Sequence, residues 1–389
     1  MGSWPRLATR ILLAPVHLAA VASASRSFGR NPFLGSDRLN RWGLHARRVA
    51  VAQRLAQHRR ERLAPALPAA DREVFERDGI LVKPDFLPPE SFARLRAEIA
   101  ALRAPAREVV QGDAVSRLLP LSPAVLERLP ETRALVTSPA WRGLLDYVAS
   151  TRVGPLLFIQ TIYSHAALGE EDPQTVLHSD TFYPSMKCWL YLQDVPAEDG
   201  PFVYVPGSHR ATPRRLWWER ERSLSWRQGD DHSRRGSLRV TPAMIRRLGY
   251  GEPVTCAARA NTLVIADTYG FHARGPSSRP STRVALWAQG RRNPFLPWTG
   301  FSPTTVRAIG DRQAVLFWKL TDWLAHRGLG RQPWRDVGVV NPMDPPLGQG
   351  ATSPAMVPGP MPAGKGSATP VAGTPKPAAA VPPGAAPVP

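Results

Sequence analysis

Short runs of alternating apolar and polar residues in the middle of the chain predict β-strands. Leu156–Tyr163 and Met186–Gln193 read in this way, and Thr262–Asp267 is a third β-rich run that ends close to a glycine. A fourth run, Arg283–Gln289, places successive side chains on opposite faces. Loops rich in Gly, Pro and Ser separate these runs, so the pattern predicts an α+β chain with a β-rich core.

The run Met186–Gln193 has two unlike faces. One face is polar and aromatic, and the other is apolar. The first is made of Lys187, Trp189 and Tyr191, and the second of Met186, Cys188, Leu190 and Leu192. We expect the polar and aromatic face to look into the interior of the β-structure and the apolar face to pack under helices.

Two histidines and an aspartate stand next to these predicted strands. His178 and Asp180 are two residues apart in the loop before the second run, and His272 follows the third. Side chains at positions i and i+2 of an extended segment point to the same side, so one metal ion can take both. Two His and one carboxylate suit non-heme Fe(II) that must also hold O2. His178, Asp180 and His272 are therefore candidate metal ligands and catalytic residues, the alternative being two hydrogen-bonded core histidines.

Four landmarks in order then resemble the phytanoyl-CoA dioxygenase (PhyH) family of Fe(II)- and 2-oxoglutarate-dependent oxygenases, from about Asp71 to Gln289. The first is the segment Phe75–Leu87, which is similar to the family's first strand and the start of the following helix. The others are the His-x-Asp triplet, the run Asp199–His209 with its Pro-Gly-Ser-His turn, and a distal His followed by Arg283 at the eleventh position.

The resemblance implies a double-stranded β-helix (jelly roll, cupin-like) with flanking N-terminal helices. It also implies Fe(II), O2 and the co-substrate 2-oxoglutarate, whose distal carboxylate would pair with Arg283. The reaction would hydroxylate an unactivated carbon of a substrate and release succinate and CO2. Halogenating relatives lack the carboxylate ligand, so Asp180 favours hydroxylation. Many members carry a small hydroxyl residue two places after the distal His, where this chain has Arg274, a second guanidinium for the dicarboxylate.

Two further side chains are candidates for the co-substrate pocket. A Trp near the position of Trp189 lines the site in the family, and Gln160 could offer its amide to 2-oxoglutarate, although an ordinary strand-edge role explains Gln160 equally well. We interpret His209 as a residue that stabilises its turn and His165 as a loop residue, neither of them a ligand.

Positive charge is concentrated in two segments. Residues 1–62 hold twelve Arg against Asp37 and Glu61, and residues 210–247 hold eleven Arg against four acids, so seventeen of the nineteen net positive charges lie there. The second segment also holds Trp217, Trp218 and Trp226, and it reads as an insertion at the mouth of the β-structure. Such an insertion suits a small anionic, acyl or lipid-linked substrate, or it is simply a solvated surface. We expect no nucleic-acid partner, since no recognition motif accompanies the charge.

The N-terminus allows more than one interpretation. Residues 1–24 resemble a signal peptide, with an apolar stretch Ile11–Ala24 behind Arg6 and Arg10, which would mean export. We prefer a cytoplasmic protein, because Fe(II) and 2-oxoglutarate are supplied inside cells and two cysteines imply no disulfide framework. Residues 1–62 could contact a membrane surface, since an apolar stripe recurs there at helical spacing: Leu39, Trp42, Ala46 and Val49. Packing of that stripe on the protein is the alternative.

Length and composition predict one main domain with extensions. The chain has 389 residues of which 43% are hydrophobic. We divide it into a basic, partly helical segment 1–70, a dioxygenase jelly-roll domain 71–341 with the insertion 210–247, and a disordered tail 342–389 rich in Pro, Ala and Gly.

Two other classes of function compete with the oxygenase. One is a non-catalytic jelly roll that binds a lipid or a carbohydrate, and the other is a membrane-surface adaptor whose two Arg-rich segments are the working parts. A binding module has no need of the whole His-Asp-His and Arg set, which favours the oxygenase.

Overall fold

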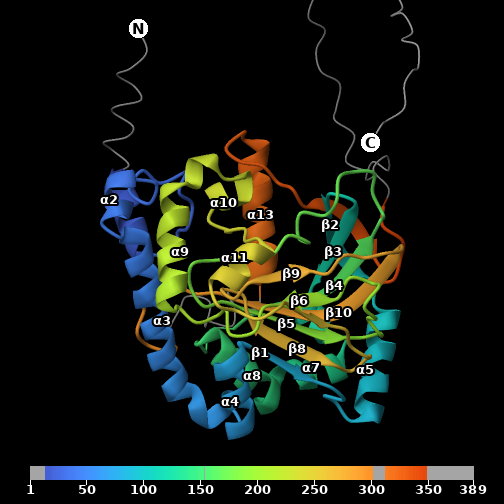
Figure 1. The fold of residues 1–389 in the computed structure, drawn as a ribbon. Coiled ribbons are helices and arrows are strands. Elements are labelled where there is room, and N and C mark those ends of the chain that lie inside the picture. Colours follow the sequence, from blue (N-terminus) through green and yellow to red (C-terminus); the bar gives the residue numbers. More distant parts are fainter. Residues whose placement is uncertain (1–13, 153, 301–311, 348–389) are drawn as a thin grey trace, which may run out of the picture. The chain divides into compact units, whose positions relative to one another are not determined.

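A computed structural model describes residues 14–152, 154–300 and 312–347. Its largest element is an eight-stranded sheet in the order β1-β8-β5-β10-β4-β3-β2-β11 (Figure 1). A three-stranded sheet has the order β7-β6-β9, and every strand pair in both sheets is antiparallel. The strands are β1 Ile80–Lys83, β2 Ala104–Gln111, β3 Ala114–Pro120, β4 Leu156–Ser164, β5 Met186–Tyr191, β6 Phe202–Tyr204, β7 Val254–Cys256, β8 Leu263–Asp267, β9 His272–Arg274, β10 Ser281–Gly290 and β11 Arg335–Val340.

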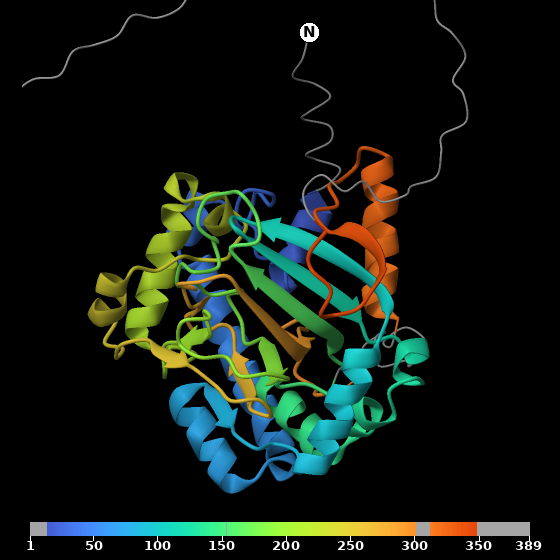
Figure 2. The same cartoon turned by 90° about the vertical axis from the view of Figure 1, so that its right-hand side faces the viewer.

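Helices lie against one side of the large sheet, below it in Figure 1 and again in the side view of Figure 2. Others stand at the end of the sheet near the insertion. The helices are α2 Asp37–Arg41, α3 Leu44–Leu63, α4 Ala69–Asp78, α5 Pro89–Ala101, α6 Pro123–Leu126, α7 Pro130–Thr137, α8 Pro139–Ala149, α9 Pro213–Leu224, α10 Asp231–Arg234, α11 Pro242–Arg247 and α13 Gln313–His326. The architecture is α+β with a β-rich core, which confirms the predicted double-stranded β-helix.

The two faces of β5 separate as their residue pattern predicted. Cys188 and Leu190 are fully buried in the main core with side chains of α5 and α8. Tyr191, on the opposite face, joins the smaller core between the two sheets, together with Phe202 and Tyr204 of β6. Strand alternation alone therefore directs one face of β5 towards the helices and the other towards the interior.

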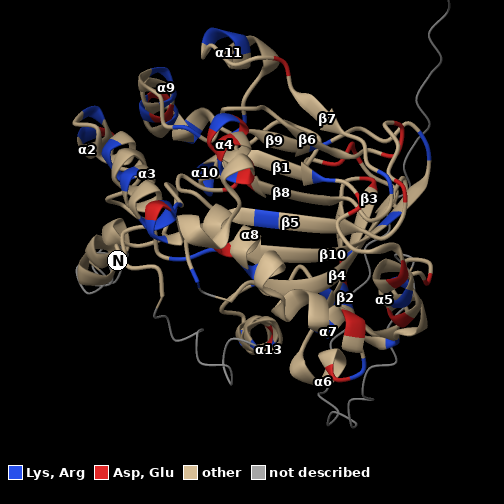
Figure 3. Cartoon of the chain, turned by 90° about the horizontal axis from the view of Figure 1, so that it is seen from below, with Lys and Arg blue, Asp and Glu red and all other residues tan. Residues whose placement is uncertain are grey.

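The two Arg-rich segments contact each other. Helix α9 of the insertion packs against α2 and α3 of the N-terminal segment, and Figure 3 shows Lys and Arg along all three. Glu219 lies between them, since its carboxylate is 2.8 Å from His45 Nε2 and 3.0 Å from Arg215 Nε. Arg215 is fully buried, with its guanidinium carbon 3.6 Å from the ring centre of Phe271. Part of the positive charge is therefore internal and structural.

The apolar stripe of the N-terminal segment is divided between core and surface. Val49 is completely buried, whereas the side chain of Trp42 is 60% exposed. No helix among the described residues is long and apolar enough to cross a membrane. Residues 1–13, and with them part of the signal-peptide candidate, lie outside the described residues.

The predicted tail lies mostly outside the described residues, which end at 347. Within its first part, the carbonyl oxygens of Asp344 and Pro345 accept hydrogen bonds from Arg117 of β3 at 2.6 Å and 2.7 Å. The division of the chain at residues 70 and 341 remains a prediction.

Arg60 of α3 ties the N-terminal segment to the large sheet. Its Nη2 lies 2.9 Å from Asp267 Oδ2 at the end of β8, and both side chains are almost completely buried. Asp267 Oδ1 also accepts backbone hydrogen bonds from Ser185 at 3.1 Å and Tyr269 at 3.0 Å. These two residues stand in the loops that lead to β5 and to His272, so the ion pair supports both halves of the candidate site.

Replacement of Arg60 should therefore lower the stability of the folded domain. We expect Arg60→Met to lower the free energy of unfolding by about 3–5 kcal/mol, because it leaves the buried carboxylate of Asp267 without its cation. The exposed Arg62→Met on the same helix should change it by less than about 0.5 kcal/mol. Urea unfolding measures both, and equal stabilities would contradict the role of the pair. Adding Asp267→Asn to Arg60→Met should recover part of the loss.

His209 is the last residue of the Pro-Gly-Ser-His turn. Its ring packs against Gly79, the residue before β1. It is 4% exposed, and its ring centre lies 5.5 Å from that of Phe75. Gly79 has a φ of +79°, and a Cβ there would lie 2.3 Å from His209 Nδ1. The position before β1 thus requires glycine for two reasons, conformation and space. Burial, with Arg60 and Arg210, lowers the pKa of His209 to about 3.

This histidine should make the fold sensitive to acid. The folded state keeps His209 neutral, while an unfolded chain protonates it below about pH 6.5. Its contribution to stability is present above about pH 6.5 and is lost as the pH falls towards 3, at up to about 1.4 kcal/mol per pH unit. We expect His209→Gln to flatten the fall of unfolding free energy between pH 6.5 and 4, whereas the exposed His58→Gln keeps the wild-type slope. Identical slopes in all three proteins would disprove this assignment.

Candidate metal centre

His178, Asp180 and His272 come together in the structure. Their ligand-type atoms all lie within 4.8 Å of one another, and all three residues are buried. His178 and Asp180 belong to the loop before β5, and His272 is the first residue of β9. The structure thus brings together the three residues that the sequence offered as metal ligands.

Backbone pairing holds the two histidines side by side. The amide of His178 donates to the carbonyl of His272 at 2.9 Å, and the amide of His272 donates to the carbonyl of His178 at 2.9 Å. The amide of Asp180 donates to the carbonyl of Thr268 at 3.0 Å. The loop carrying the triplet is therefore paired like an additional strand, which fixes the direction of its side chains.

Hydrogen bonds orient the two imidazole rings. His178 Nδ1 lies 2.7 Å from the carbonyl oxygen of Val176, and His272 Nδ1 lies 2.9 Å from that of Gly270. A carbonyl oxygen can only accept, so both rings carry their proton on Nδ1 and present the Nε2 lone pair. Each Nε2 lies 3.8 Å from an oxygen of Asp180.

The protonation state of the site suits a cation. Burial, the largest effect, lowers the pKa of His272 to about 4 and that of His178 well below its ordinary value. Burial alone would raise the pKa of Asp180, but Lys187, His272 and Arg291 hold it well below its usual range. His272 Nε2 is buried and has no hydrogen-bond partner among the described residues. Two neutral imidazoles, one carboxylate and an unsatisfied nitrogen fit a divalent metal ion.

A cavity of about 100 Å³ opens beside His272. It is lined by residues of β4, β5, β6, β9 and β10, and all four predicted co-substrate residues are among them: Gln160, Trp189, Arg274 and Arg283. The structure thereby places the predicted residues around one space, next to the predicted metal ligands.

Arg283 is the buried cation of this cavity that lacks an anion. Its side chain extends from β10, and its Nε and Nη2 are buried without a hydrogen-bond partner among the described residues. Burial, followed by the charge of Arg274, lowers the pKa of Arg283 to about 10, so that it is still a cation at neutral pH. A buried guanidinium with two free N–H groups fits a carboxylate that binds through both of its oxygens.

The other three predicted residues differ in how many of their polar groups already have hydrogen-bond partners. Trp189 Nε1 donates to Gln160 Oε1 at 3.0 Å, which leaves the amide nitrogen of Gln160 available. Arg274 already has partners, because its guanidinium donates to the Asp172 carboxylate and to Ser116 Oγ. Arg274 is therefore less free than Arg283 to take up a second anion.

Sequence reasoning missed the cation next to the metal site. Lys187 was expected to face the interior, and its Nζ is 2.8 Å from Asp180 Oδ2. A charged residue near the start of an otherwise apolar and aromatic strand was the available signal. Asp172, the partner of Arg274, gave no such signal, because it stands in an irregular loop.

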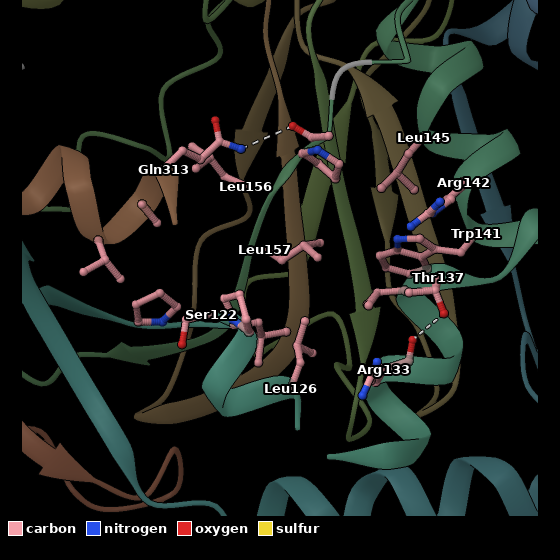
Figure 4. A pocket seen from close by; sticks show the side chains of 18 of the residues that line it. Ser122, Leu126, Arg133, Thr137, Trp141, Arg142, Leu145, Leu156, Leu157 and Gln313 are labelled. Carbon is pink, nitrogen blue, oxygen red and sulfur yellow. Dashed lines mark hydrogen bonds between the residues drawn. The ribbon is translucent and has the colours of Figure 1, made fainter. Parts of the chain in front are cut away.

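A larger cavity, of about 540 Å³, lies elsewhere and is shown in Figure 4. Trp141, Leu145 and Leu157 line its apolar wall, with Arg133 and Arg142 at its polar side. None of the predicted site residues reaches it, and none of the three metal-ligand candidates lines it. The smaller cavity is the one that His272 and the predicted co-substrate residues line.

The chain matches one known protein family. Residues 75–242 match the sequence model of the family described as Phytanoyl-CoA dioxygenase (PhyH). The chain carries a phytanoyl-CoA dioxygenase domain. This confirms the predicted family of Fe(II)- and 2-oxoglutarate-dependent oxygenases. The PhyH match includes His178 and Asp180, while His272 and Arg283 lie beyond it, on β9 and β10.

Solved structures similar to the chain include non-heme, alpha ketoglutarate-dependent enzymes. No curated protein sequence matches the chain. The epimerase SnoN in complex with Fe3+, alpha ketoglutarate and nogalamycin RO is 22% identical, over 57% of this chain and 84% of its own, with a TM-score of 0.38. The carbocyclase SnoK from nogalamycin biosynthesis is 20% identical, over 58% and 84%, with a TM-score of 0.36. HygX from Streptomyces hygroscopicus, with nickel, 2-oxoglutarate and hygromycin B bound, is 14% identical, over 57% and 86%, with a TM-score of 0.34. At these values none of them assigns a reaction to this PhyH domain.

Metal binding should be measurable without any substrate. We expect anaerobic addition of Fe(II) or Co(II) to raise the midpoint of thermal unfolding, because the metal binds the folded His-Asp-His set and not the unfolded chain. His272→Gln should abolish most of this shift, whereas the control His165→Gln, in a loop and 41% exposed, should keep it. A shift of equal size in the His272→Gln protein would mean that the metal binds elsewhere.

Proposed function

We propose that this protein hydroxylates an unactivated carbon of a small substrate that is anionic or lipid-like, in a reaction that converts 2-oxoglutarate and O2 to succinate and CO2. The observation that carries the proposal is a single arrangement. His272, one of three clustered potential Fe(II) ligands, lines the same small cavity as the buried, unpaired Arg283.

The roles of the ligand residues follow from their protonation and direction. His178 and His272 would bind Fe(II) through Nε2, since Nδ1 of each ring is used by a backbone carbonyl. Asp180 would supply the carboxylate, and its presence favours hydroxylation over halogenation, which needs that position for a halide. Bound Fe(II) would supply the activation of O2, while the protein holds the reactants and excludes water.

Arg283 would fix the co-substrate. Its two free N–H groups would pair with the distal carboxylate of 2-oxoglutarate, leaving the keto acid end to reach the metal. Trp189 and the free amide nitrogen of Gln160 would border the 2-oxoglutarate molecule. Arg274, while paired with Asp172, would add positive charge near it. Buried strands carry Gln160, Trp189 and Arg283, so the site is preorganised.

The proposed location is the cytoplasm. Cys188 and Cys256 are both buried free thiols in different sheets, as expected where disulfides do not form. Peripheral membrane contact through residues 1–62 stays part of the proposal, with the exposed Trp42 as the side chain available for it.

An anaerobic titration tests the metal and co-substrate site directly. The purified protein with Fe(II) and 2-oxoglutarate should develop the weak visible charge-transfer band of the chelate. Arg283→Gln should weaken 2-oxoglutarate binding by about tenfold or more, through loss of charge-assisted hydrogen bonds in a buried site. The exposed Arg259→Gln should bind like the wild type. Absence of a band in folded wild-type protein would favour a non-catalytic binding module.

Turnover provides the second measurement of the proposal. We expect wild-type protein to form succinate from 2-oxoglutarate with Fe(II) and O2, and His178→Ala to lose this activity. Unchanged succinate formation in His178→Ala would rule out the proposed metal centre.

A further inference from the structure

Several cations act on Asp180, and one of them, Lys187, also lines the cavity that holds Arg283. Arg291, which follows β10, has its Nη2 3.8 Å from Asp180 Oδ2. Lys187 lies closer, at 2.8 Å. Neither Arg291 nor Arg26 lines the cavity with Arg283, although both act electrostatically on the same carboxylate.

Arg26 is the unexpected member, because it comes from the N-terminal segment. Burial lowers its pKa, the charge of Arg291 lowers it further, and Asp180 and Tyr183 oppose the shift. No described residue makes a hydrogen bond or ion pair with the Arg26 side chain. A half-buried guanidinium next to another cation is costly without an anion, so the position implies a bound partner.

The loop that carries Arg26 is firmly held. Arg48 of α3 donates to the carbonyl oxygens of Val21 at 2.8 Å, Ser23 at 3.0 Å and Ser25 at 2.8 Å. The residues after Arg26 contact the insertion, since the amide of Gly29 donates to the carbonyl of Arg234 at 3.3 Å. A Cβ at Gly236 would lie only 2.3 Å from the carbonyl oxygen of Arg26. The backbone at Arg26 is therefore packed from two sides.

Arg48 also connects Arg26 to the segment of Arg291. Its guanidinium carbon lies 4.1 Å from the ring centre of Phe182, two residues after Asp180, and 5.6 Å from that of Phe295. Arg291 is oriented in turn by Gln289, whose side-chain oxygen, in the orientation that satisfies both groups, accepts from Nε at 2.7 Å and Nη2 at 2.8 Å. Three separate segments thus converge on one side of the candidate metal centre.

The charges of this group do not balance within the protein. Lys187, Arg26 and Arg291 share one carboxylate, Asp180, and a bound metal ion would draw on that same carboxylate. Arg239 also acts on this region, but it has its own acid, with its Nε 3.7 Å from Asp230 Oδ2. In the metal-loaded protein, two guanidinium groups next to the metal would have no counterion.

We propose that Arg26 and Arg291 form a binding subsite for a carboxylate or phosphate group of the primary substrate, next to the metal and separate from the 2-oxoglutarate cavity. This inference rests on the proposed function, and it narrows the substrate class to organic acids or phosphate esters. Two guanidinium groups recognise either anion through paired N–H donors, and the lipid-like part of the earlier proposal is not needed for it.

Calorimetric titration with simple anions tests this subsite in the full-length protein. Acetate, sulfate and inorganic phosphate are each titrated into the anaerobic protein loaded with Fe(II) and 2-oxoglutarate. Preference for acetate over sulfate and phosphate identifies a carboxylate, and the reverse identifies a phosphate group. Arg26→Gln and Arg291→Gln should each weaken binding of the preferred anion by about tenfold, the effect of losing a charge-assisted hydrogen bond.

Two variants serve as controls. Arg30→Gln removes an exposed cation four residues from Arg26 and should bind the anion like the wild type. Arg26→Lys keeps the charge but loses the planar fork, so its affinity should fall between those of wild type and Arg26→Gln. No anion binding by the wild type, or equal binding by all variants, overturns the subsite.

The charge-transfer band separates this inference from the proposed function. We expect the band to persist in Arg26→Gln, because Arg26 is not one of the candidate metal ligands and does not line the proposed 2-oxoglutarate cavity. If the band is present and anions do not bind, the subsite fails while the oxygenase site stands. If the wild type shows no band but binds anions through Arg26, the assignment of that anion to an oxygenase substrate is overturned.

Discussion

The candidate site depends on one reciprocal backbone pairing. The amide and carbonyl of His178 exchange two hydrogen bonds of 2.9 Å with those of His272, which joins a loop before β5 to the start of β9. The pairing fixes the directions in which the two side chains leave the backbone, and the Nδ1 hydrogen bonds to backbone carbonyls hold the rings, whose centres lie 4.5 Å apart. Asp180 stands two residues after His178. In an extended chain, side chains two residues apart point to the same side, so the carboxylate of Asp180 reaches the same point.

Arginine has two distinct roles in this protein. Some guanidinium groups are structural: Arg48 and Arg59 are buried and donate mainly to backbone carbonyl oxygens, and Arg60 joins α3 to Asp267. They fix loops that carry no regular structure of their own. Others lie at the candidate site: Arg283 has buried N–H groups without a partner among the described residues, and Arg291 shares the Asp180 carboxylate with Lys187. The high net charge therefore reflects internal architecture as much as surface.

Charge around the site is divided in space. Arg283 serves the cavity within the β-structure, where strands position it, while Arg26 and Arg291 come from loops at another side of Asp180. A dicarboxylate co-substrate and an anionic substrate could then bind simultaneously without sharing a cation. Strand-borne residues give precision to the shared chemistry, and loop-borne residues can change with the substrate.

Sequence alone predicted the fold class and the strands around the site, because strand alternation and short-range spacing are local properties. It also proposed the His-Asp-His set that the structure brings together and the Arg283 that lines the neighbouring cavity. The alternation correctly predicted that Cys188 and Leu190 face the helices and that Trp189 faces the interior. The sequence could not reveal that Lys187 pairs with Asp180, that Asp172 occupies Arg274, or that Arg26 reaches the site. The Asp172–Arg274 pair and the position of Arg26 join segments that are distant in the chain, and the Lys187–Asp180 pair depends on how the irregular loop before β5 folds back, so only the tertiary structure decides them.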